Sequence, residues 1–194
     1  MIKHDLKKTE ILKVAAKVFR TKGYHATRIQ DIADALNMQK GSLYYYITTK
    51  EDLLKGLVED ILEQSVDLLS SIQDTQHTPA EKIRLCIESH LRLFHNNLDA
   101  FGIFISEDLE LINKTSDKDI FQLMKVYENG WLEIFSEGVK SGAFRQDANY
   151  KVIVKGILGM LNWSYRWYHV KHKLSIEEIS AIFADLLLNG VHRK

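Results

Sequence analysis

Apolar residues recur every three or four positions along most of this chain, as in the run Ile11, Val14, Ala15, Val18 and Phe19. That spacing lines one face of a helix. No stretch alternates apolar and polar residues for long enough to form several strands. The pattern predicts an all-α protein with helices at about 8–22, 27–36, 38–46, 50–72, 79–96, 98–111, 117–141, 148–169 and 175–191.

Local signals at the ends of these segments support the helix assignments. Gly23 and Asn37 each follow a helix and favour the left-handed conformation that ends one. Pro79 occupies a first helical position, where its missing N–H is not needed. Four helices begin with a hydroxyl residue three positions before a carboxyl or amide, namely Thr27 with Gln30, Thr49 with Asp52, Thr78 with Glu81 and Ser175 with Glu178.

Charge divides the chain unevenly, although its formal net charge is zero. Residues 1–50 hold ten Lys and Arg against four Asp and Glu, a net charge of +6, and the remainder carries −6. A basic N-terminal part indicates contact with a polyanion. An accidental imbalance on a solvated surface is the alternative, so the decision rests on the motif in this part of the chain.

The helices expected at 27–36 and 38–46 are short and separated by a tight turn, the arrangement of a helix-turn-helix. Leu43 and Ile47 are expected to anchor the second helix, and Gly41 would let its backbone approach DNA closely. Lys50, at the start of the next helix, is expected to attract a phosphate. Packing of the tyrosines between helices is the alternative. The expected DNA-binding residues are Thr27, Arg28, Gln39, Lys40, Gly41, Ser42, Tyr44, Tyr45, Tyr46 and Lys50.

The stretch from Phe19 to Leu54 resembles the DNA-binding domain of the TetR family of bacterial repressors. The resemblance rests on Gly23-Tyr24, Thr27, Asp31-Ile32-Ala33, Leu36, the run Lys40 to Tyr46, and Lys50-Glu51-Asp52-Leu53-Leu54. Ile47 stands where the family often has phenylalanine, and Tyr46 replaces a frequent histidine. The resemblance implies a homodimer that binds a palindromic operator through residues 1–49. It also implies release when a small molecule binds the helical ligand-binding and dimerisation domain of residues 50–194, which a long helix joins to the N-terminal domain.

The C-terminal part is rich in aromatic residues at helical spacing, which could line an apolar cavity. An ordinary packed core is the alternative. The expected ligand-binding residues are Phe101, Phe104, Ile105, Phe121, Met124, Tyr127, Trp131, Asn162, Trp163, Arg166 and Trp167. The run Asn162 to His169, with Leu174 to Ile179 and Phe183 to Leu186, is similar to the C-terminal part of TetR-family regulators of fatty acid, sterol or aromatic-acid breakdown. That similarity implies a hydrophobic effector, with acyl-coenzyme A thioesters as one class.

The last two expected helices carry apolar residues on more than one side. Such helices need a partner, and pairing with their copies would give a four-helix dimer interface in which Gly156 and Gly159 allow close approach. Burial of these residues within one subunit is the alternative. The apolar residues are Val152, Ile153, Ile157, Leu158 and Leu161 in the first helix and Ile179, Ile182, Phe183, Leu186 and Leu187 in the second.

Other classes of protein fit the chain less well. No catalytic motif, phosphate-binding glycine loop or dinucleotide fingerprint is present, so no enzyme, catalytic residue or cofactor is expected. His169 and His172 have a spacing that could hold a metal, but solvated histidines are the simpler interpretation, and Cys86 is expected to fill a core. No membrane span is expected, and one cysteine fits the cytoplasm. A ligand-independent architectural or division factor of the same fold is the alternative function.

Overall fold

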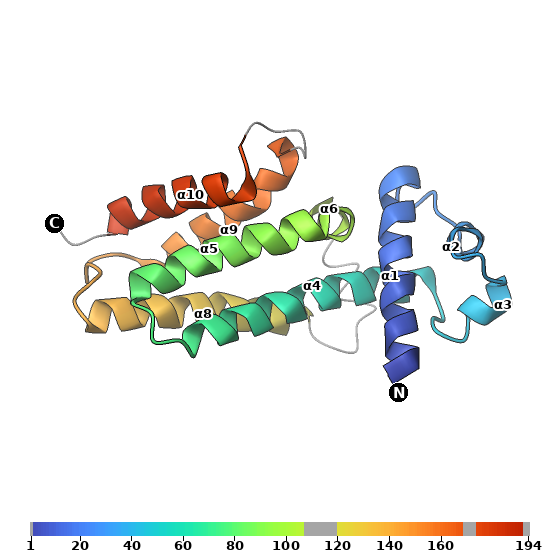
Figure 1. The fold of residues 1–194 in the computed structure, drawn as a ribbon, viewed down its shortest axis with the longest axis horizontal. Coiled ribbons are helices and arrows are strands. Elements are labelled where there is room, and N and C mark those ends of the chain that lie inside the picture. The colour runs from blue at the N-terminus through green and yellow to red at the C-terminus, as the bar shows by residue number, and fades with distance from the viewer. Residues whose placement is uncertain (1, 107–119, 169–173, 192–194) are drawn as a thin grey trace. The chain divides into compact units, whose positions relative to one another are not determined.

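The computed structural model describes residues 2–106, 120–168 and 174–191, and its regular elements within those ranges are helices (Figure 1). No β-strand lies within the described ranges. The prediction of an all-α fold is confirmed. The helices are α1 (Ile2–Lys22), α2 (Ile29–Ala35), α3 (Lys40–Leu43), α4 (Lys50–Gln73), α5 (Pro79–Asn96), α6 (Leu98–Ser106), α8 (Ile120–Lys140), α9 (Tyr150–Trp167) and α10 (Ile176–Val191).

Three of the four expected capping pairs are present. The Thr49 amide donates to Asp52 Oδ2 at 2.7 Å, and the Asp52 amide donates back to Thr49 Oγ1 at 3.1 Å. The pairs at Thr78 with Glu81 and at Ser175 with Glu178 make the same reciprocal bonds. Each pair satisfies backbone N–H groups that the first turn of a helix leaves without partners.

The capping pair expected at Thr27 and Gln30 is wrong. Arg28 precedes α2, and its amide donates to Asp31 Oδ2 at 2.8 Å. The Thr27 hydroxyl instead donates to the Gly23 carbonyl at 2.8 Å and is buried. The Asp31 carboxylate fixes the start of α2, because it accepts the hydrogen bond of the Arg28 amide. The sequence predicts the equivalent bond one residue earlier, between Thr27 and Gln30.

The second helix of the expected helix-turn-helix and its following turn, residues 38–47, which we call the recognition segment, form a shorter regular helix than expected. α3 covers Lys40–Leu43, whereas the sequence predicts a helix over 38–46. Hydrogen bonds continue beyond α3, since the amides of Tyr46 and Ile47 both donate to the Leu43 carbonyl. The expected left-handed residues are confirmed, with φ of 82° at Gly23 and 51° at Asn37. Parts of three expected helices, at residues 107–111, 117–119 and 169, lie outside the described residues.

Packing divides the chain into two units, and α4 contributes to both. The first unit comprises Met1–Ile61 and Asn97–Phe121, and in it α1 packs against α2 and α6. An ion pair joins Arg20 of α1 to Asp99 of α6. The functional boundary expected between residues 49 and 50 stays a prediction, because packing groups the start of α4 and all of α6 with the N-terminal helices. The apolar core of this unit includes Ile11, Phe19, Ile32, Leu43 and Leu53.

The second unit comprises Leu62–Asn96 and Gln122–Lys194, and in it α5 packs against α9 and α10. A Cβ atom at Gly130 of α8 would lie 2.4 Å from the side chain of Leu69, so α8 and α4 approach closely at this point. Lys82 is buried and donates to the Gln73 carbonyl at 3.0 Å and to Glu137 at 2.9 Å. These bonds hold the end of α4 against α5 and α8. The core residues of this unit include Ile83, Ile87, Phe94, Trp131, Phe135, Leu161 and Leu188.

Candidate DNA-binding surface and ligand cavity

The recognition segment is anchored by apolar side chains and presents its tyrosines to solvent. Leu43 is fully buried and Ile47 is buried, as expected for the anchors of this segment. Tyr45 is 76% exposed and Tyr44 is 46% exposed. Such large exposed rings are suited to contacts with base methyl groups and sugar–phosphate backbone.

Small and polar residues share this exposed surface. Gln39, Lys40, Gly41 and Ser42 are all exposed. A Cβ atom at Gly41 would meet no other atom within 4 Å, so the packing of this unit does not require glycine there. The Lys40 ammonium lies 5.7 Å from the centre of the Tyr44 ring, which keeps a positive charge beside the aromatic surface. Tyr45 and Tyr46 pack edge to face, with ring centres 5.2 Å apart.

The three expected residues outside this segment have different environments. Arg28 is exposed beside the N-terminus of α2, whereas the Thr27 hydroxyl is directed to the Gly23 carbonyl. The Lys50 ammonium donates to the carbonyls of Tyr24 at 2.8 Å, His25 at 3.4 Å and Thr27 at 3.2 Å. These bonds use the three ammonium hydrogens. Lys50 therefore supports the turn between α1 and α2, and the phosphate contact expected for it stays a prediction.

The expected ligand-binding residues are divided between the two units. Phe101, Phe104, Ile105 and Phe121 belong to the first unit, where the first two are buried and Phe121 is 43% exposed. The other seven belong to the second unit. Among those seven, the structure brings Tyr127, Trp131 and Asn162 together and leaves Trp163, Arg166 and Trp167 on the outside.

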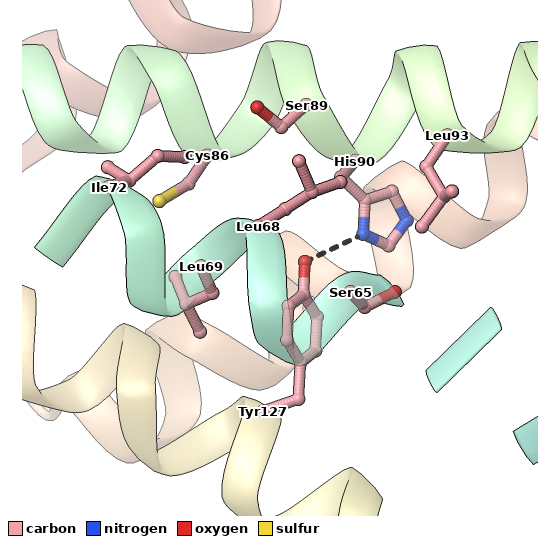
Figure 2. Close-up of a pocket in the computed structure, with 9 residues that line it drawn as sticks. All are labelled: Ser65, Leu68, Leu69, Ile72, Cys86, Ser89, His90, Leu93 and Tyr127. Atoms are coloured by element: carbon pink, nitrogen blue, oxygen red, sulfur yellow. Dashed lines mark hydrogen bonds between the residues drawn. The ribbon is translucent and has the colours of Figure 1, made fainter. Parts of the chain in front are cut away.

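A narrow cavity lies between α4, α5 and α8 in the second unit, with room for roughly one water molecule. Figure 2 shows the His90 ring of α5 directed toward the Tyr127 hydroxyl of α8, and the two are joined by a hydrogen bond of 3.1 Å between Nδ1 and the hydroxyl oxygen. Both side chains are buried. The cavity is lined by Ser65, Leu68, Leu69, Ile72, Cys86, Ser89, His90, Leu93 and Tyr127.

Burial keeps the titratable groups of this cavity uncharged at neutral pH. Burial lowers the pKa of His90 to about 4, and nearby Asn162 opposes this shift. Burial also raises the pKa of Tyr127, which the indole N–H of Trp131 opposes. The pKa of Cys86 is raised to about 12, again by burial. Since no Lys, Arg, Asp or Glu lines the cavity, it presents neutral hydrogen-bonding groups in an apolar wall.

Sequence reasoning missed His90 and the serines of this cavity. His90 lies on the apolar face of α5, where Ile83, Cys86 and Ile87 precede it at helical spacing. A polar residue within such a stripe is the signal that could have identified it, because a buried imidazole needs hydrogen-bonding partners. Cys86 is buried, as expected for a residue that fills the core.

The outer face of α9 and α10 exposes apolar residues and glycines. Val152, Gly156, Gly159 and Trp163 follow one another at helical spacing on α9, and all are exposed. A Cβ atom at either glycine would meet nothing within 4 Å. On α10, Ile182 is 53% and Leu186 is 66% exposed. In contrast, the stripe residues Ile157, Leu161 and Ile179 are buried within the second unit.

Two further expectations concern a metal site and a membrane span. In these ranges no group of three or more His, Cys, Asp and Glu side chains could hold a metal ion, and His169 and His172 lie outside them. None of the helices in the described part of the chain has the length and apolar content needed to cross a bilayer.

Two protein-family models match the chain. Residues 11–57 match "Bacterial regulatory proteins, tetR family", and residues 76–191 match "Tetracyclin repressor-like, C-terminal domain". The first match covers α2, α3 and the start of α4, and the second covers the cavity residues of α5 and α8 and the outer face of α9 and α10.

Similar proteins extend over nearly the whole chain. The HTH-type transcriptional repressor KstR2 of Mycolicibacterium smegmatis is 27% identical over 95% of this chain and 90% of its own length. The fatty acid metabolism regulator protein of Bacillus subtilis is 25% identical over 95% of each chain. The structure of AibR in complex with isovaleryl coenzyme A and operator DNA is 26% identical, with a TM-score of 0.78 over 93% of this chain and 97% of that chain. The chain therefore belongs to the TetR family of bacterial regulatory proteins and is a transcriptional regulator rather than an enzyme.

Proposed function

We propose that this regulator is a homodimeric repressor that binds a palindromic DNA operator in the bacterial cytoplasm. It leaves the operator when a hydrophobic effector of acyl-CoA type binds the second unit. The observation that carries the proposal is that the chain has two separate features. One is an exposed surface in the first unit, formed by Gln39, Lys40, Ser42, Tyr44 and Tyr45, which we call the recognition surface. The other is a buried cavity in the second unit.

The recognition surface fits a major groove. Its exposed side chains carry amide, ammonium, hydroxyl and aromatic groups, which are the groups that contact base edges and phosphates. Residues 1–50 also carry a net charge of +6, which favours association with DNA. The expected DNA-binding residues Gln39, Lys40, Ser42, Tyr44 and Tyr45 form the centre of this proposed contact, since all five are exposed.

The dimer is proposed to form through the outer face of α9 and α10. Exposed apolar side chains on two adjacent helices are suited to burial against a second copy. Gly156 and Gly159 would let the two copies of α9 approach closely, and packing within one subunit gives no other reason for these glycines. A dimer also places two recognition helices on two half-sites, which a palindrome requires.

The effector is proposed to enter the cavity beside His90 and Tyr127. That cavity is too small for an acyl chain as it stands, so a ligand would separate its walls. The AibR structure contains isovaleryl coenzyme A, and the B. subtilis relative is a fatty acid metabolism regulator. These relatives support an acyl-CoA effector for this chain.

Release from DNA is proposed to follow from a movement of α4. The helix contributes Leu68, Leu69 and Ile72 to the cavity and begins at Lys50, which supports the turn before α2. Two recognition helices must lie one DNA turn apart, about 34 Å, or a multiple of it. A ligand that binds better when α4 is displaced from this arrangement lowers the affinity for the operator. Bound operator lowers the affinity for the ligand by the same factor.

A DNA selection followed by a ligand titration tests the proposal. The full-length protein would first select duplexes from a random pool, and we expect a palindrome with half-sites one turn or a multiple apart. Acyl-CoA thioesters of four to sixteen carbons, at concentrations far above their dissociation constants, would then be added to the complex on that duplex. We expect at least one length to release the DNA. If the protein binds the palindrome equally well in the presence of acyl-CoA thioesters of every chain length, the result would support the ligand-independent factor instead.

A further inference from the structure

We infer that complementary charges decide how two copies of this chain pair, with α9 of each copy packed against α10 of the other. In this arrangement Lys155 and Arg166 of one copy form ion pairs with Asp185 and Glu178 of the partner subunit. The inference rests on the proposed function, because it specifies how the outer face of α9 and α10 meets its own copy.

Charge is segregated between these two helices. α9 carries three basic and no acidic residues, whereas α10 carries three acidic and no basic residues. All six are exposed, and they are Lys151, Lys155 and Arg166 on α9 and Glu177, Glu178 and Asp185 on α10. A face built from one basic and one acidic helix is complementary to its own copy only in certain orientations.

Two of the basic residues lie along the side of α9 that faces away from α10. Ile153 and Met160 line a groove between α9 and α10, so they mark the side of α9 that faces α10. Helical periodicity places Lys155 and Arg166 across the outer face from them. Lys155 accordingly faces α8, where its ammonium lies 3.1 Å from the Glu128 carboxylate. Lys155 and Arg166 therefore form a basic edge of the outer face.

Two of the acidic residues lie at the opposite edge. Leu187 lines the same groove and marks the side of α10 that faces α9. Helical periodicity places Glu178 and Asp185 across the outer face of α10 from Leu187. Asp185 accepts a hydrogen bond of 3.1 Å from Asn189, which is uncharged and leaves the negative charge in place. Glu178 and Asp185 therefore form an acidic edge.

A twofold axis can bring two such faces together in two ways. If the axis runs along the helices, α9 of each copy lies against α10 of the other, and each basic edge meets an acidic edge. If the axis runs across the helices, α9 lies against α9 and α10 against α10, so like charges meet. Opposed like charges disfavour association, and the charges therefore select the first arrangement.

Heights along the helices show which charges meet. Within one subunit, the middle of α9 lies level with residues 186–187 of α10, because both line the groove. The two helices run in opposite directions (Figure 1), so the end of α9 lies level with the start of α10. Lys155 is therefore within about one helical turn of the height of Asp185, and Arg166 is near the height of Glu178.

An axis along the helices leaves these heights unchanged. Lys155 then lies opposite Asp185 of the partner subunit, and Arg166 lies opposite Glu178 of the partner subunit. Symmetry repeats each pair, so charges flank the apolar centre of the interface on both sides. The two copies of α9 lie across a diagonal of the four helices, and the exposed glycines of α9 keep that diagonal short.

Charge reversal tests the pairing. Lys155→Glu places an acid opposite the partner's Asp185, and Asp185→Lys places a base opposite the partner's Lys155. We expect either variant to raise the dimer dissociation constant about tenfold in sedimentation equilibrium without DNA, because each change acts at two symmetry-related positions. Lys13→Glu makes the same change in net charge on the exposed face of α1, and this control should dimerise like the native protein.

Combining the two changes should restore the interface. In the double variant Lys155→Glu/Asp185→Lys, acid and base exchange helices and opposite charges meet again. We expect its dissociation constant to lie within about threefold of the native value. An equimolar mixture of the two single variants should form mainly the mixed dimer, which native mass spectrometry detects when one variant is isotopically labelled. A folding defect in a single variant does not produce this recovery.

Three results would count against these ideas, and they are distinguishable. Native dimer affinity in either single variant would overturn the pairing and leave the proposed dimer standing. Weakened single variants without recovery in the double variant would also overturn it, because the charges would then act within one subunit. A native protein that stays monomeric at the concentrations where it binds the selected palindrome would overturn the proposed dimer as well.

Discussion

The Lys50 ammonium lies over the ring of Tyr24, 4.4 Å from its centre, and donates a hydrogen bond of 2.8 Å to the Tyr24 carbonyl. The first residue of α4 is thereby joined to the turn that connects α1 and α2. Tyr24 in turn packs edge to face against Phe19 of α1, with ring centres 5.1 Å apart. A single lysine thus connects α1, the turn before α2 and the start of α4.

Replacement of Lys50 should destabilise the first unit. Lys50→Met keeps most of the aliphatic side chain and removes the ammonium, leaving carbonyls of Tyr24 and Thr27 without their charged donor. Since Lys50 is partly exposed and water can replace part of the bonding, we expect a loss of about 1–2 kcal/mol in the free energy of unfolding. Urea denaturation followed by circular dichroism would measure it. Lys13→Met, on the exposed face of α1, is the control, and equal stability of the two variants would contradict this role for Lys50.

Replacement of Tyr45 should weaken DNA binding without affecting the fold. The side chain is 76% exposed, so Tyr45→Ala removes little buried surface. We expect the affinity for the selected palindrome to fall at least tenfold in fluorescence anisotropy, with a change in unfolding free energy below about 0.5 kcal/mol. Tyr45→Phe separates the ring from the hydroxyl, because it should retain affinity if the ring contacts thymine methyl groups. Native affinity in Tyr45→Ala would place the recognition surface elsewhere.

Acidification should destabilise the protein through His90. The pKa of this imidazole falls from about 6.5 to about 4 on burial, so between these pH values the unfolded chain binds a proton that the folded protein does not. The free energy of unfolding therefore decreases as the pH falls from 6.5 to 4, by about 3 kcal/mol from this residue.

Two histidine variants would isolate that contribution. His90→Gln keeps a neutral group that can bond the Tyr127 hydroxyl, and we expect it to lose less stability than the native protein over the same pH range. His77→Gln changes an exposed histidine and should follow the native curve. Equal pH dependence of His90→Gln and the native protein would show that His90 does not control this loss.

A large residue at Gly159 should separate the proposed dimer. A leucine Cβ at this position meets nothing within 4 Å in the subunit, and leucine is a better helix former than glycine by roughly 0.8 kcal/mol. We therefore expect Gly159→Leu to fold normally and to dissociate at higher protein concentrations than the native protein in sedimentation equilibrium. Ser136→Leu, on an exposed face of α8, should leave the dimer unchanged. A dimer of native affinity in Gly159→Leu would move the interface away from this part of α9.

The helical elements were predictable because the signals that fix them are local. The bounds of α5 agree with the sequence prediction, since Pro79 and the pair of Thr78 with Glu81 mark its start unambiguously. The start of α2 was misplaced because two adjacent residues, Thr27 and Arg28, each precede a suitable side chain three positions later. The choice between Gln30 and Asp31 as the capping side chain depends on where the turn after Gly23 places each one.

The residues of the candidate sites were likewise predictable only where local sequence signals decide their position. Periodicity identified Leu43 and Ile47 as anchors, so the exposed residues between and around them followed from helix geometry. Periodicity alone could not separate Tyr127 from Trp163, because both are aromatic residues on amphipathic helices. Tyr127 is buried beside His90 of another helix, whereas Trp163 is 63% exposed.

The sequence by itself determined the helical fold, the basic N-terminal part, the recognition segment and the family resemblance, because each rests on residues close together in the chain. Only the tertiary structure assigned Lys50 to the turn carbonyls, joined His90 to Tyr127 and left Gly156 and Gly159 without neighbours. Those features depend on which faces of distant helices meet. Lys50 and Tyr24 are 26 positions apart in the sequence, and His90 and Tyr127 are 37 apart, so the packing of different helices decides these contacts and no single helix encodes them.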